Sequence, residues 1–471
     1  MKNSSMLIKN TFIAAMGKIF TQIAQILVLP YLTATLSTGE YGDYDFILYL
    51  VLLLAPFITL MTEEFIFRKA VDSSKQKMKI YFSSSIFFIT VTTSLFLLIL
   101  LFIKIIFNFH YCLYLGLFTV SFSFFTLLQF FARGRGKVII YSVSQFLVSF
   151  INVVLNILFV LILKLGVSGL LLANVISYVV TIMYLCISLS VKNYLSIKMV
   201  SIKQIKQMLK YSLPLFPNGI SWIISSFSER FIIITHLGNS YNGIYSVSNK
   251  FPNISNILYG FFNIAWSENA IKNLNNDDKG TYYCKIHKIV KRLMISFAFL
   301  MISTLTIIYW FLVDVSFSDS YLYIPILLLS IYYFDMAKFL ESIFIAYNDT
   351  QSIGKTILMP LILNCLLNVI FINKFSLFAV AVSNLISNVI LYYIRIIKLR
   401  KYVQLAIFEY FDIYILVTYC TLLFAYYSHN TIINVTSILF SILFSIVCNK
   451  VIINFFFGIL KRVLFQKGGK V

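Results

Sequence analysis

Long apolar runs alternate with short polar segments along the whole chain. A helix needs roughly 20 residues to cross the hydrocarbon core of a membrane, and in lipid its backbone groups must be paired within the segment. We therefore predict an all-α polytopic membrane protein with about fourteen transmembrane helices. Their approximate ranges are 11–36, 44–67, 80–106, 110–132, 139–163, 167–190, 212–237, 243–266, 289–313, 321–347, 355–373, 375–397, 409–428 and 431–457.

Basic residues lie mainly in every second gap between these runs and at the two ends of the chain. Loops that are rich in lysine and arginine stay in the cytoplasm when a membrane protein inserts. The opposite gaps are short and contain only Lys104, Lys164 and Lys374. This pattern predicts that both termini are cytoplasmic, that the first span is not cleaved, and that no extracytoplasmic domain exists.

Composition supports a membrane class and argues against several others. Only 12% of the residues are charged and 60% are hydrophobic, whereas a soluble domain has roughly 25% charged residues. The net charge of +21 sits in short loops, which favours anionic membrane lipids as partners and argues against nucleic acid. The six cysteines are dispersed without a CxxC motif, so we predict no metal site and no cofactor.

A basic segment at residues 191–211 divides the apolar runs into two sets. In the stretch S-I-K-Q-I-K-Q-M-L-K, Ile202, Ile205 and Leu209 recur at helical spacing opposite the lysines. An amphipathic helix on the inner membrane surface fits this pattern. A solvated linker is the alternative interpretation.

The two sets of runs resemble each other. The segment Leu36 to Tyr44 matches Leu237 to Tyr245 through leucine, glycine and tyrosine at a constant offset. Asparagines in two consecutive spans of each set also match in the same order: Asn152, Asn156 and Asn174 with Asn364, Asn368 and Asn384. Chance similarity in a background rich in Ile, Leu, Phe and Asn is the alternative to a true repeat.

Each copy of the repeat contains six spans, so both copies enter the membrane in the same orientation. We predict two parallel six-helix lobes around a central cavity, at residues 1–190 and 212–400, followed by two additional helices and a basic cytoplasmic tail at 401–471. Parallel repeats of this kind are typical of transporters, in which the substrate site lies between the halves.

Four basic residues lie well inside predicted spans: Lys18, Arg230, Lys250 and Lys338. Each costs about 2.5–3.5 kcal/mol on membrane-insertion scales unless it faces protein or water. One interpretation is a cationic cavity that binds an anionic substrate. The other is pairing with the intramembrane carboxylates Glu229, Asp335 and Glu341, or snorkelling toward the membrane surface.

The intramembrane carboxylates and asparagines have two possible roles each. Asp335, Lys338 and Glu341 share one helix face, as either a neutralised structural group or a site that couples a proton or cation to transport. The six matched asparagines either join helices through amide hydrogen bonds or line the cavity and contact sugar hydroxyls.

Three stretches carry a family resemblance. They are L-P-Y-L-T-A-T-L-S-T-G-E-Y-G-D-Y at Leu29 to Tyr44, S-E-R-F-I-I-I at Ser228 to Ile234, and G-I-Y-S-V-S-N-K-F-P at Gly243 to Pro252. With the paired asparagine helices, they resemble the polysaccharide and O-antigen flippases (Wzx type) of the multidrug/oligosaccharidyl-lipid/polysaccharide exporter superfamily. Glu229 stands where that family often has aspartate, which preserves the charge.

The resemblance implies a transporter of the bacterial inner membrane that works by alternating access and is not an enzyme. Its substrate would be an undecaprenyl-pyrophosphate-linked oligosaccharide, an O-antigen or other surface polysaccharide unit, moved from the cytoplasmic to the periplasmic leaflet. A polysaccharide polymerase and a chain-length regulator would be its protein partners in polysaccharide or lipopolysaccharide biosynthesis.

Two other functions remain open from the sequence. A small-molecule cation exporter of the same superfamily would need buried carboxylates to dominate, yet the four intramembrane basic residues outnumber the three acidic ones. An integral-membrane polysaccharide polymerase shares the composition, but such enzymes generally have a large extracytoplasmic loop, and we predict none here.

Overall fold

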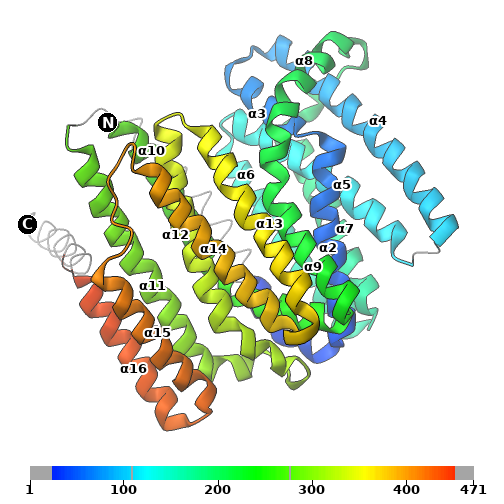
Figure 1. The fold of residues 1–471 in the computed structure, drawn as a ribbon. Helices are drawn as coiled ribbons and strands as arrows, with labels where there is room; N and C mark the ends of the chain where they lie inside the picture. The colour runs from blue at the N-terminus through cyan, green and yellow to red at the C-terminus, as the bar shows by residue number, and fades with distance from the viewer. Residues whose placement is uncertain (1–23, 108–109, 275–276, 451–453, 455–471) are drawn as a thin grey trace, which may run out of the picture. The chain divides into compact units, whose positions relative to one another are not determined.

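The computed structural model describes residues 24–107, 110–274, 277–450 and 454. Within these ranges the chain forms helices and no strands, as Figure 1 shows. The prediction of an all-α polytopic protein is therefore confirmed. The chain has two compact units, and we describe each one by itself.

Eleven helices among the described residues are long and apolar enough to cross a membrane. They are α2 (Thr38–Thr59), α4 (Lys75–Phe107), α5 (Cys112–Gly134), α6 (Val138–Asn156) with its π-helical end η1 (Ile157–Ile162), α7 (Gly166–Ser188), α11 (Lys279–Leu312), α12 (Ile324–Ala346), α13 (Thr350–Phe375), α14 (Leu377–Leu399), α15 (Tyr410–Ser428) and α16 (Thr431–Cys448).

The other three predicted spans need separate comment. Helices α9 (Phe216–Leu237) and α10 (Asn239–Lys272) are long, but they carry many serine and asparagine side chains and several charges. The first predicted span, 11–36, lies partly outside the described residues, which contain its last part as the helix Ala24–Thr35. The total of fourteen spans therefore stays a prediction.

The predicted continuous span 44–67 is wrong, because the chain breaks after α2 and resumes as α3 (Thr62–Asp72). Leu60 and Met61 at the break have φ of 46° and 58°, a left-handed conformation that costs L-residues energy. The side chain of Met61 occupies the space beside Gly219 of α9, where a Cβ would lie 2.5 Å from Met61 Cε. Neither residue 60 nor 61 is Gly or Asn, the residues that adopt a left-handed conformation most easily.

Several predicted cytoplasmic loops are partly helical. Helix α4 begins at Lys75 and α11 at Lys279, so helices continue past their apolar stretches into the basic segments. Arg395, at the end of the predicted span 375–397, lies in α14 and is 1% exposed. Lys291 is also buried, in α11, with its Nζ 2.6 Å from Asp412 Oδ1. Acidic partners in the fold let these two cations be buried.

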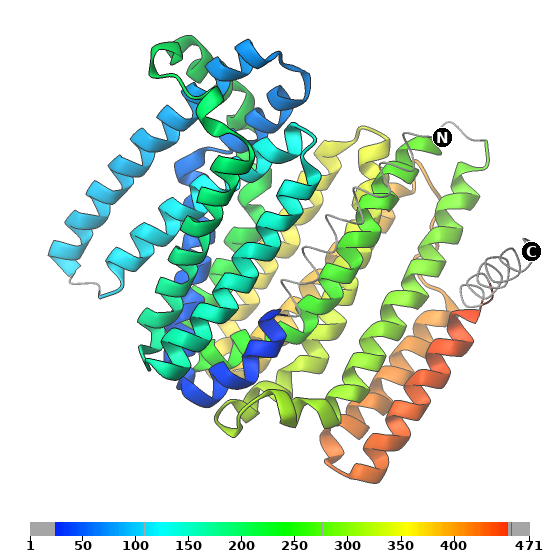
Figure 2. The same cartoon turned by 180° about the vertical axis from the view of Figure 1, so that it is seen from behind.

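Unit 1 comprises the described parts of Met1–Ser246 together with Leu312–Phe317. Its central helix α5 packs against α7, α3 and α2, while α6 packs on α7 and α2 packs on α9. Among its described residues, one hydrophobic cluster lies around Phe82, Phe131 and Met208 and another around Val51, Phe118 and Leu171. Figure 2 shows the same helices from behind.

The basic segment between the two sets of spans folds onto unit 1. After the short helices η2 (Val191–Tyr194) and η3 (Ile197–Met199), α8 (Ile202–Ser212) packs on α3 and α4. Its Met208 is buried and Ile205 packs beside it, whereas Ile202 is 72% exposed. A helix is present where we predicted one, but the face that packs on α3 and α4 centres on Met208 and leaves Ile202 exposed.

Unit 2 comprises the described parts of Val247–Phe311 and Ser318–Val471. Helix α14 packs closely on α12 and α13, and Ser376 with a φ of 52° is the only residue between α13 and α14. Helices α15 and α16 form a hairpin at one edge of this unit (Figure 1). The boundary between the units, at Ser246, falls inside α10 and does not coincide with the boundary between the two copies of the repeat. The lobe boundaries that we predicted from the repeat therefore stay a prediction.

Candidate functional site

Sequence-predicted charged residues lie in two buried groups among the described residues, one in each unit. In unit 1, Arg230 of α9 reaches Asp45 of α2, with 2.8 Å between Nε and Oδ2, and both side chains are 4% exposed. We name this group the Asp45–Arg230 cluster. Asp45 was not among the residues that we predicted to matter, because it lies in a stretch rich in acidic and aromatic residues near the start of α2.

Both charged groups of the Asp45–Arg230 cluster have further partners. Ser246 donates a hydrogen bond of 2.6 Å to Asp45 Oδ1, and Arg230 donates one of 2.9 Å to the Ser226 carbonyl. The guanidinium carbon of Arg230 lies 3.3 Å from the centre of the Tyr49 ring, a cation–π contact. A buried ion pair with this many partners is a closed structural unit.

Glu229 lies beside this cluster and has its own partner. The hydroxyl of Tyr245 donates a hydrogen bond of 2.7 Å to Glu229 Oε2, and the Glu229 side chain is 7% exposed. Tyr245 belongs to the first turns of α10, the element that also supplies Ser246. Glu229 therefore contacts Tyr245 of α10 directly, and Arg230 is linked to the next residue, Ser246, through Asp45.

Two matched glycines of the repeat meet next to the Asp45–Arg230 cluster. A Cβ added at Gly42 would collide with the backbone of Asn239, and one at Gly243 would collide with the Thr38 carbonyl. Asn242 donates a hydrogen bond of 2.8 Å to the Gly42 carbonyl. The glycines that made the two segments similar in sequence are thus the residues that allow α2 and the start of α10 to approach closely.

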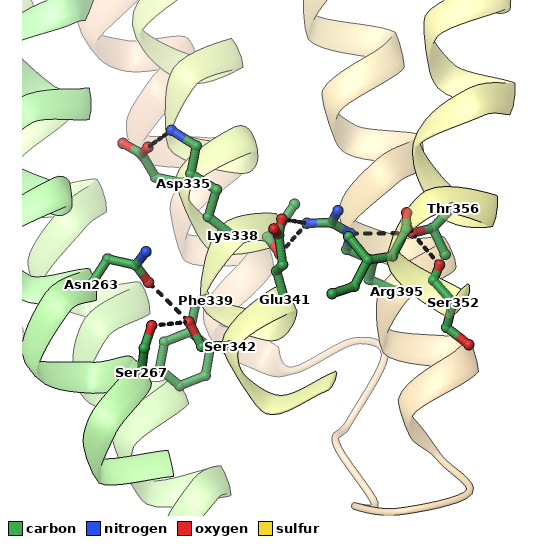
Figure 3. Close-up of polar contacts among 12 residues, drawn as sticks. Asn263, Ser267, Asp335, Lys338, Phe339, Glu341, Ser342, Ser352, Thr356 and Arg395 are labelled. Carbon is green, nitrogen blue, oxygen red and sulfur yellow. Dashed lines mark hydrogen bonds and ion pairs between the residues drawn. The ribbon is translucent and has the colours of Figure 1, made fainter. Parts of the chain in front are cut away.

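The second cluster lies in unit 2 and is shown in Figure 3. Lys338 Nζ is 3.7 Å from Asp335 Oδ1 on the same face of α12, and it donates a hydrogen bond of 2.7 Å to Asn256 of α10. It also lies 4.3 Å from the centre of the Phe334 ring. Asp335 is fully buried, but 27% of the Lys338 side chain is exposed.

Glu341 does not complete a triad with Asp335 and Lys338. It pairs instead with Arg395 of α14, with 3.0 Å between Oε2 and the guanidinium nitrogen (Figure 3). Arg395 also donates hydrogen bonds to the Ala337 carbonyl at 2.7 Å and to the Thr356 hydroxyl at 3.4 Å. Sequence reasoning missed Arg395 because it belongs to a run of basic residues that follows an apolar stretch.

The asparagines of unit 2 form a chain of amides. Asn368 donates to Asn364 at 2.9 Å, and Asn364 donates to Asn384 at 2.8 Å, which joins α13 to α14.

The matched asparagines of unit 1 make different contacts. Asn156 donates to Asn152 within α6 at 2.8 Å, while Asn174 of α7 donates to the Tyr44 hydroxyl of α2 at 3.1 Å. Asn174, Asn364 and Asn384 thus each hydrogen-bond a residue of another helix, and Asn368 bonds to Asn364.

The other two predicted cavity residues are Lys18 and Lys250. Lys18 lies outside the described residues, and Lys250 of α10 is half-buried. The substrate-binding roles of Lys18, Arg230, Lys250 and Lys338 therefore stay predictions. Their surroundings differ: Arg230 is enclosed by partners, whereas Lys338 keeps part of its side chain exposed.

Comparisons with known proteins give a family match from the sequence and a shared fold from solved structures. A family model described as polysaccharide biosynthesis protein matches residues 7–267. A search of curated proteins found no significant match. Among solved structures, one described as lipid II flippase MurJ in an inward closed conformation has a TM-score of 0.73 at 14% identity, covering 96% of this chain and 100% of that chain.

Multidrug transporters share the fold as well. An inward-facing transporter of the MATE family, described as belonging to the MOP superfamily, has a TM-score of 0.66 at 15% identity and covers 81% of this chain and 95% of its own. The Vibrio cholerae MATE transporter VcmN in its bent form has a TM-score of 0.54 at 12% identity, covering 85% of this chain and 99% of that one.

Proposed function

Because this chain belongs to the polysaccharide biosynthesis protein family, we propose that it is a flippase for undecaprenyl-pyrophosphate-linked oligosaccharides. It moves the saccharide headgroup from the cytoplasmic to the periplasmic leaflet of a bacterial inner membrane. One observation carries the proposal: a chain of a polysaccharide family has, over nearly its whole length, the fold of a protein described as a lipid II flippase.

The physical task of such a flippase is to hide polar groups from lipid. A sugar hydroxyl without hydrogen-bond partners costs several kcal/mol in hydrocarbon, so the headgroup needs a polar path through the membrane. Two parallel lobes that open alternately to each side offer this path, while the lipid tail stays in the bilayer. The chain itself carries out no covalent chemistry in this scheme.

Lys338 is the best placed of the proposed substrate-binding cations. Part of its side chain is exposed, and its contact with Asp335 is long enough to be exchanged for a contact with pyrophosphate or an acidic sugar. Arg230 would serve in this role only after leaving Asp45. Lys18 and Lys250 complete the proposed set.

We propose that Glu229, Asp335 and Glu341 couple a proton or cation to transport in the same way. Each of the three carboxylates has a partner within its own unit: Tyr245, Lys338 and Arg395 respectively. A proton or cation that replaced such a partner would free the cation or hydroxyl for another contact. This exchange would link ion entry to a change in helix packing.

The proposal includes orientation and partners. The distribution of basic residues supports cytoplasmic termini, and anionic lipids of the inner leaflet would attract the basic segments. A unit delivered to the outer leaflet must be consumed there, so a polymerase and a chain-length regulator are the partners we propose. O-antigen is one such unit.

A reconstituted assay tests the function directly. Purified full-length protein is placed in vesicles that carry a fluorescent undecaprenyl-pyrophosphate oligosaccharide, and a membrane-impermeant glycosidase outside the vesicles removes accessible sugars. In vesicles without protein we expect about half of the lipid to be protected, since it is distributed over both leaflets. Vesicles with protein should lose this protection within minutes, and equal protection in both samples would refute the proposal.

The likeness to MATE transporters favours one second candidate, a multidrug exporter. A cationic dye loaded into the same vesicles separates the two functions. The flippase proposal expects dye retention to be the same with and without protein under an imposed proton or sodium gradient. Gradient-driven dye movement together with unchanged lipid protection would favour the exporter.

A further inference from the structure

The basic segment between the two sets of spans is fixed to α4 by its backbone. We name residues 191–212, which comprise η2, η3 and α8, the connector. Ser83 of α4 accepts a hydrogen bond of 2.9 Å from the Ser196 amide, and Ser84 accepts one of 3.1 Å from the Ser201 amide. The connector therefore has a defined position along α4, and Figure 1 shows α8 beside that helix.

Side chains hold the connector at two further points. The ring centre of Tyr194 lies 5.3 Å from that of Phe131 in α5, and Arg135 donates a hydrogen bond of 3.3 Å to the Tyr194 hydroxyl. In α8, the buried Met208 accepts a hydrogen bond of 3.0 Å from the Ser85 hydroxyl at its sulfur. The connector is thus an ordered part of unit 1, with one face packed and the other exposed.

The level of the connector along α4 lies between a polar and an apolar stretch of that helix. The exposed Lys77 precedes Ser83 by about 9 Å at 1.5 Å per helical residue. Phe87 follows Ser83 by about 6 Å and begins an exposed apolar stripe that continues with Val91. In a bilayer such a stripe faces the hydrocarbon and the lysine faces water, so the connector lies at the level of the lipid headgroups.

The exposed face of the connector combines apolar and basic side chains. Ile197 of η3 is 92% exposed and Ile202 of α8 is 72% exposed. Lys198, Lys203 and Lys206 are exposed beside them. Within the described part of the chain, these three lysines make no ion pair and no side-chain hydrogen bond. Both the apolar area and the positive charge of this face are therefore available to a ligand.

We propose that the connector is a binding site for an anionic lipid, whose phosphate is held by Lys198, Lys203 and Lys206 and whose acyl chains contact Ile197 and Ile202. Lysines next to exposed apolar side chains at headgroup level are typical of segments that bind anionic lipid. The site goes beyond a general attraction of basic loops, because its two kinds of contact are held in place by α4 and α5. Its assignment to the inner leaflet rests on the proposed orientation of the chain, but not on the proposed substrate.

An acidic segment of another protein is the other occupant with matching charge. It would neutralise the lysines, but it would leave Ile197 and Ile202 without an apolar partner at the edge of the membrane. A lipid uses both parts of the surface, since its phosphate carries the negative charge and its chains bury the isoleucines. The geometry therefore favours the lipid.

Thermal unfolding of the purified full-length protein in a neutral detergent tests the site. Phosphatidylglycerol is the anionic probe, and phosphatidylcholine with the same acyl chains is the neutral one. A ligand that binds only the folded state raises the unfolding temperature, so phosphatidylglycerol should raise it by a few degrees more than phosphatidylcholine does. Native mass spectrometry should also find more phosphatidylglycerol than phosphatidylcholine bound per chain. Equal effects of the two lipids would refute the proposal.

A triple variant tests the basic part of the site: Lys198→Gln, Lys203→Gln and Lys206→Gln. Each lysine near an anionic surface contributes a factor of about five, so the apparent affinity for phosphatidylglycerol should fall at least tenfold. The three side chains are exposed, so the variant should unfold at the natural temperature in phosphatidylcholine.

A matched control removes the same charge from exposed positions of unit 2 on the same predicted side of the membrane: Lys285→Gln, Lys355→Gln and Arg400→Gln. This control should bind phosphatidylglycerol as the natural sequence does. An equal loss of affinity in both triple variants would show that only the net charge of the protein matters, and would overturn the proposed site.

The double variant Ile197→Ser with Ile202→Ser keeps every charge and tests the apolar part. Its affinity for phosphatidylglycerol should fall at least tenfold, because two isoleucines no longer bury apolar area against the lipid. Polyglutamate, an acidic peptide, should not stabilise the natural protein at physiological ionic strength. If the double variant keeps its affinity for phosphatidylglycerol, or if only polyglutamate stabilises the protein, the surface binds an acidic protein segment and the proposal fails.

Discussion

The two buried charge clusters differ in how completely their charges are enclosed. In the Asp45–Arg230 cluster both charged side chains are 4% exposed, the ion pair is 2.8 Å long, and a serine, a carbonyl and a tyrosine ring surround it. In unit 2, Lys338 is 27% exposed and lies 3.7 Å from Asp335. A cation inside a predicted span can therefore either hold helices together or remain available to bind a ligand. The number of its partners and their distances distinguish these two roles.

The largest effect on stability is expected for Arg230→Ala. The substitution leaves Asp45 buried without its counter-ion, which costs about 3–5 kcal/mol in comparable buried pairs. The unfolding temperature of the purified variant should fall strongly. The double variant Asp45→Asn with Arg230→Gln should recover much of the loss, because it removes both charges. If Arg230→Ala unfolds like the natural protein, the cluster is not a structural tie.

Lys338→Gln should separate stability from transport. The amide still reaches toward Asn256, so we expect a loss of roughly 1–3 kcal/mol, smaller than for Arg230→Ala. Loss of the exposed charge should reduce flipping of a pyrophosphate-linked lipid in the vesicle assay at least tenfold. Lys338→Arg, which keeps the charge, should retain more activity than the glutamine variant. Unchanged flipping by Lys338→Gln would remove this residue from the proposed substrate path.

A smaller effect is expected for Asn364→Leu. This change breaks the amide chain between α13 and α14, and interhelical hydrogen bonds in membranes contribute about 0.6 kcal/mol on average. The unfolding temperature should therefore drop slightly, and Asn152→Leu in unit 1 should have even less effect, because the Asn156 to Asn152 bond stays within one helix. Equal and large losses for both variants would show that the amides do more than join helices.

The smallest effect is expected at an ion pair whose lysine is exposed, which serves as a reference for the buried pairs. Asp349, at the N-terminus of α13, accepts a hydrogen bond of 2.6 Å from Lys401, and this bond together with those from Ser352 lowers the pKa of Asp349 to about 2. Because the folded-state pKa is depressed, its stabilising contribution is present above the ordinary pKa of aspartate and is lost as the pH falls toward 2. Lys401→Ala should raise the pKa of Asp349, as seen by carboxyl NMR, and lower the unfolding temperature at pH 7 by less than any of the buried variants does.

Much of the fold could be predicted because hydropathy acts locally. Each apolar run long enough to cross the bilayer must become a helix, since lipid offers no partner for its backbone groups. The family resemblance read from Leu29 to Tyr44, Ser228 to Ile234 and Gly243 to Pro252 is confirmed by the family match over residues 7–267. The matched glycines Gly42 and Gly243 also proved to lie at one close contact.

The candidate site could be predicted only in part. Arg230, Lys338, Asp335 and Glu341 stand out in the sequence because charge inside an apolar run is expensive. Their partners do not stand out: Asp45 is 185 residues away from Arg230, and Arg395 is 54 residues away from Glu341. Which opposite charges meet depends on how helices far apart in the chain pack together.

The sequence by itself determined that this protein is helical, crosses the membrane many times and belongs to a polysaccharide family, because composition and local pattern carry that information. The tertiary structure decided which buried charges are enclosed by partners and which remain partly exposed. It also placed a backbone break at Leu60 and Met61, although neither residue is Gly or Asn. The physical reason is the same in both cases. Burial and pairing are properties of contacts between distant residues, and one of these contacts, Met61 against Gly219, fills the space beside the break.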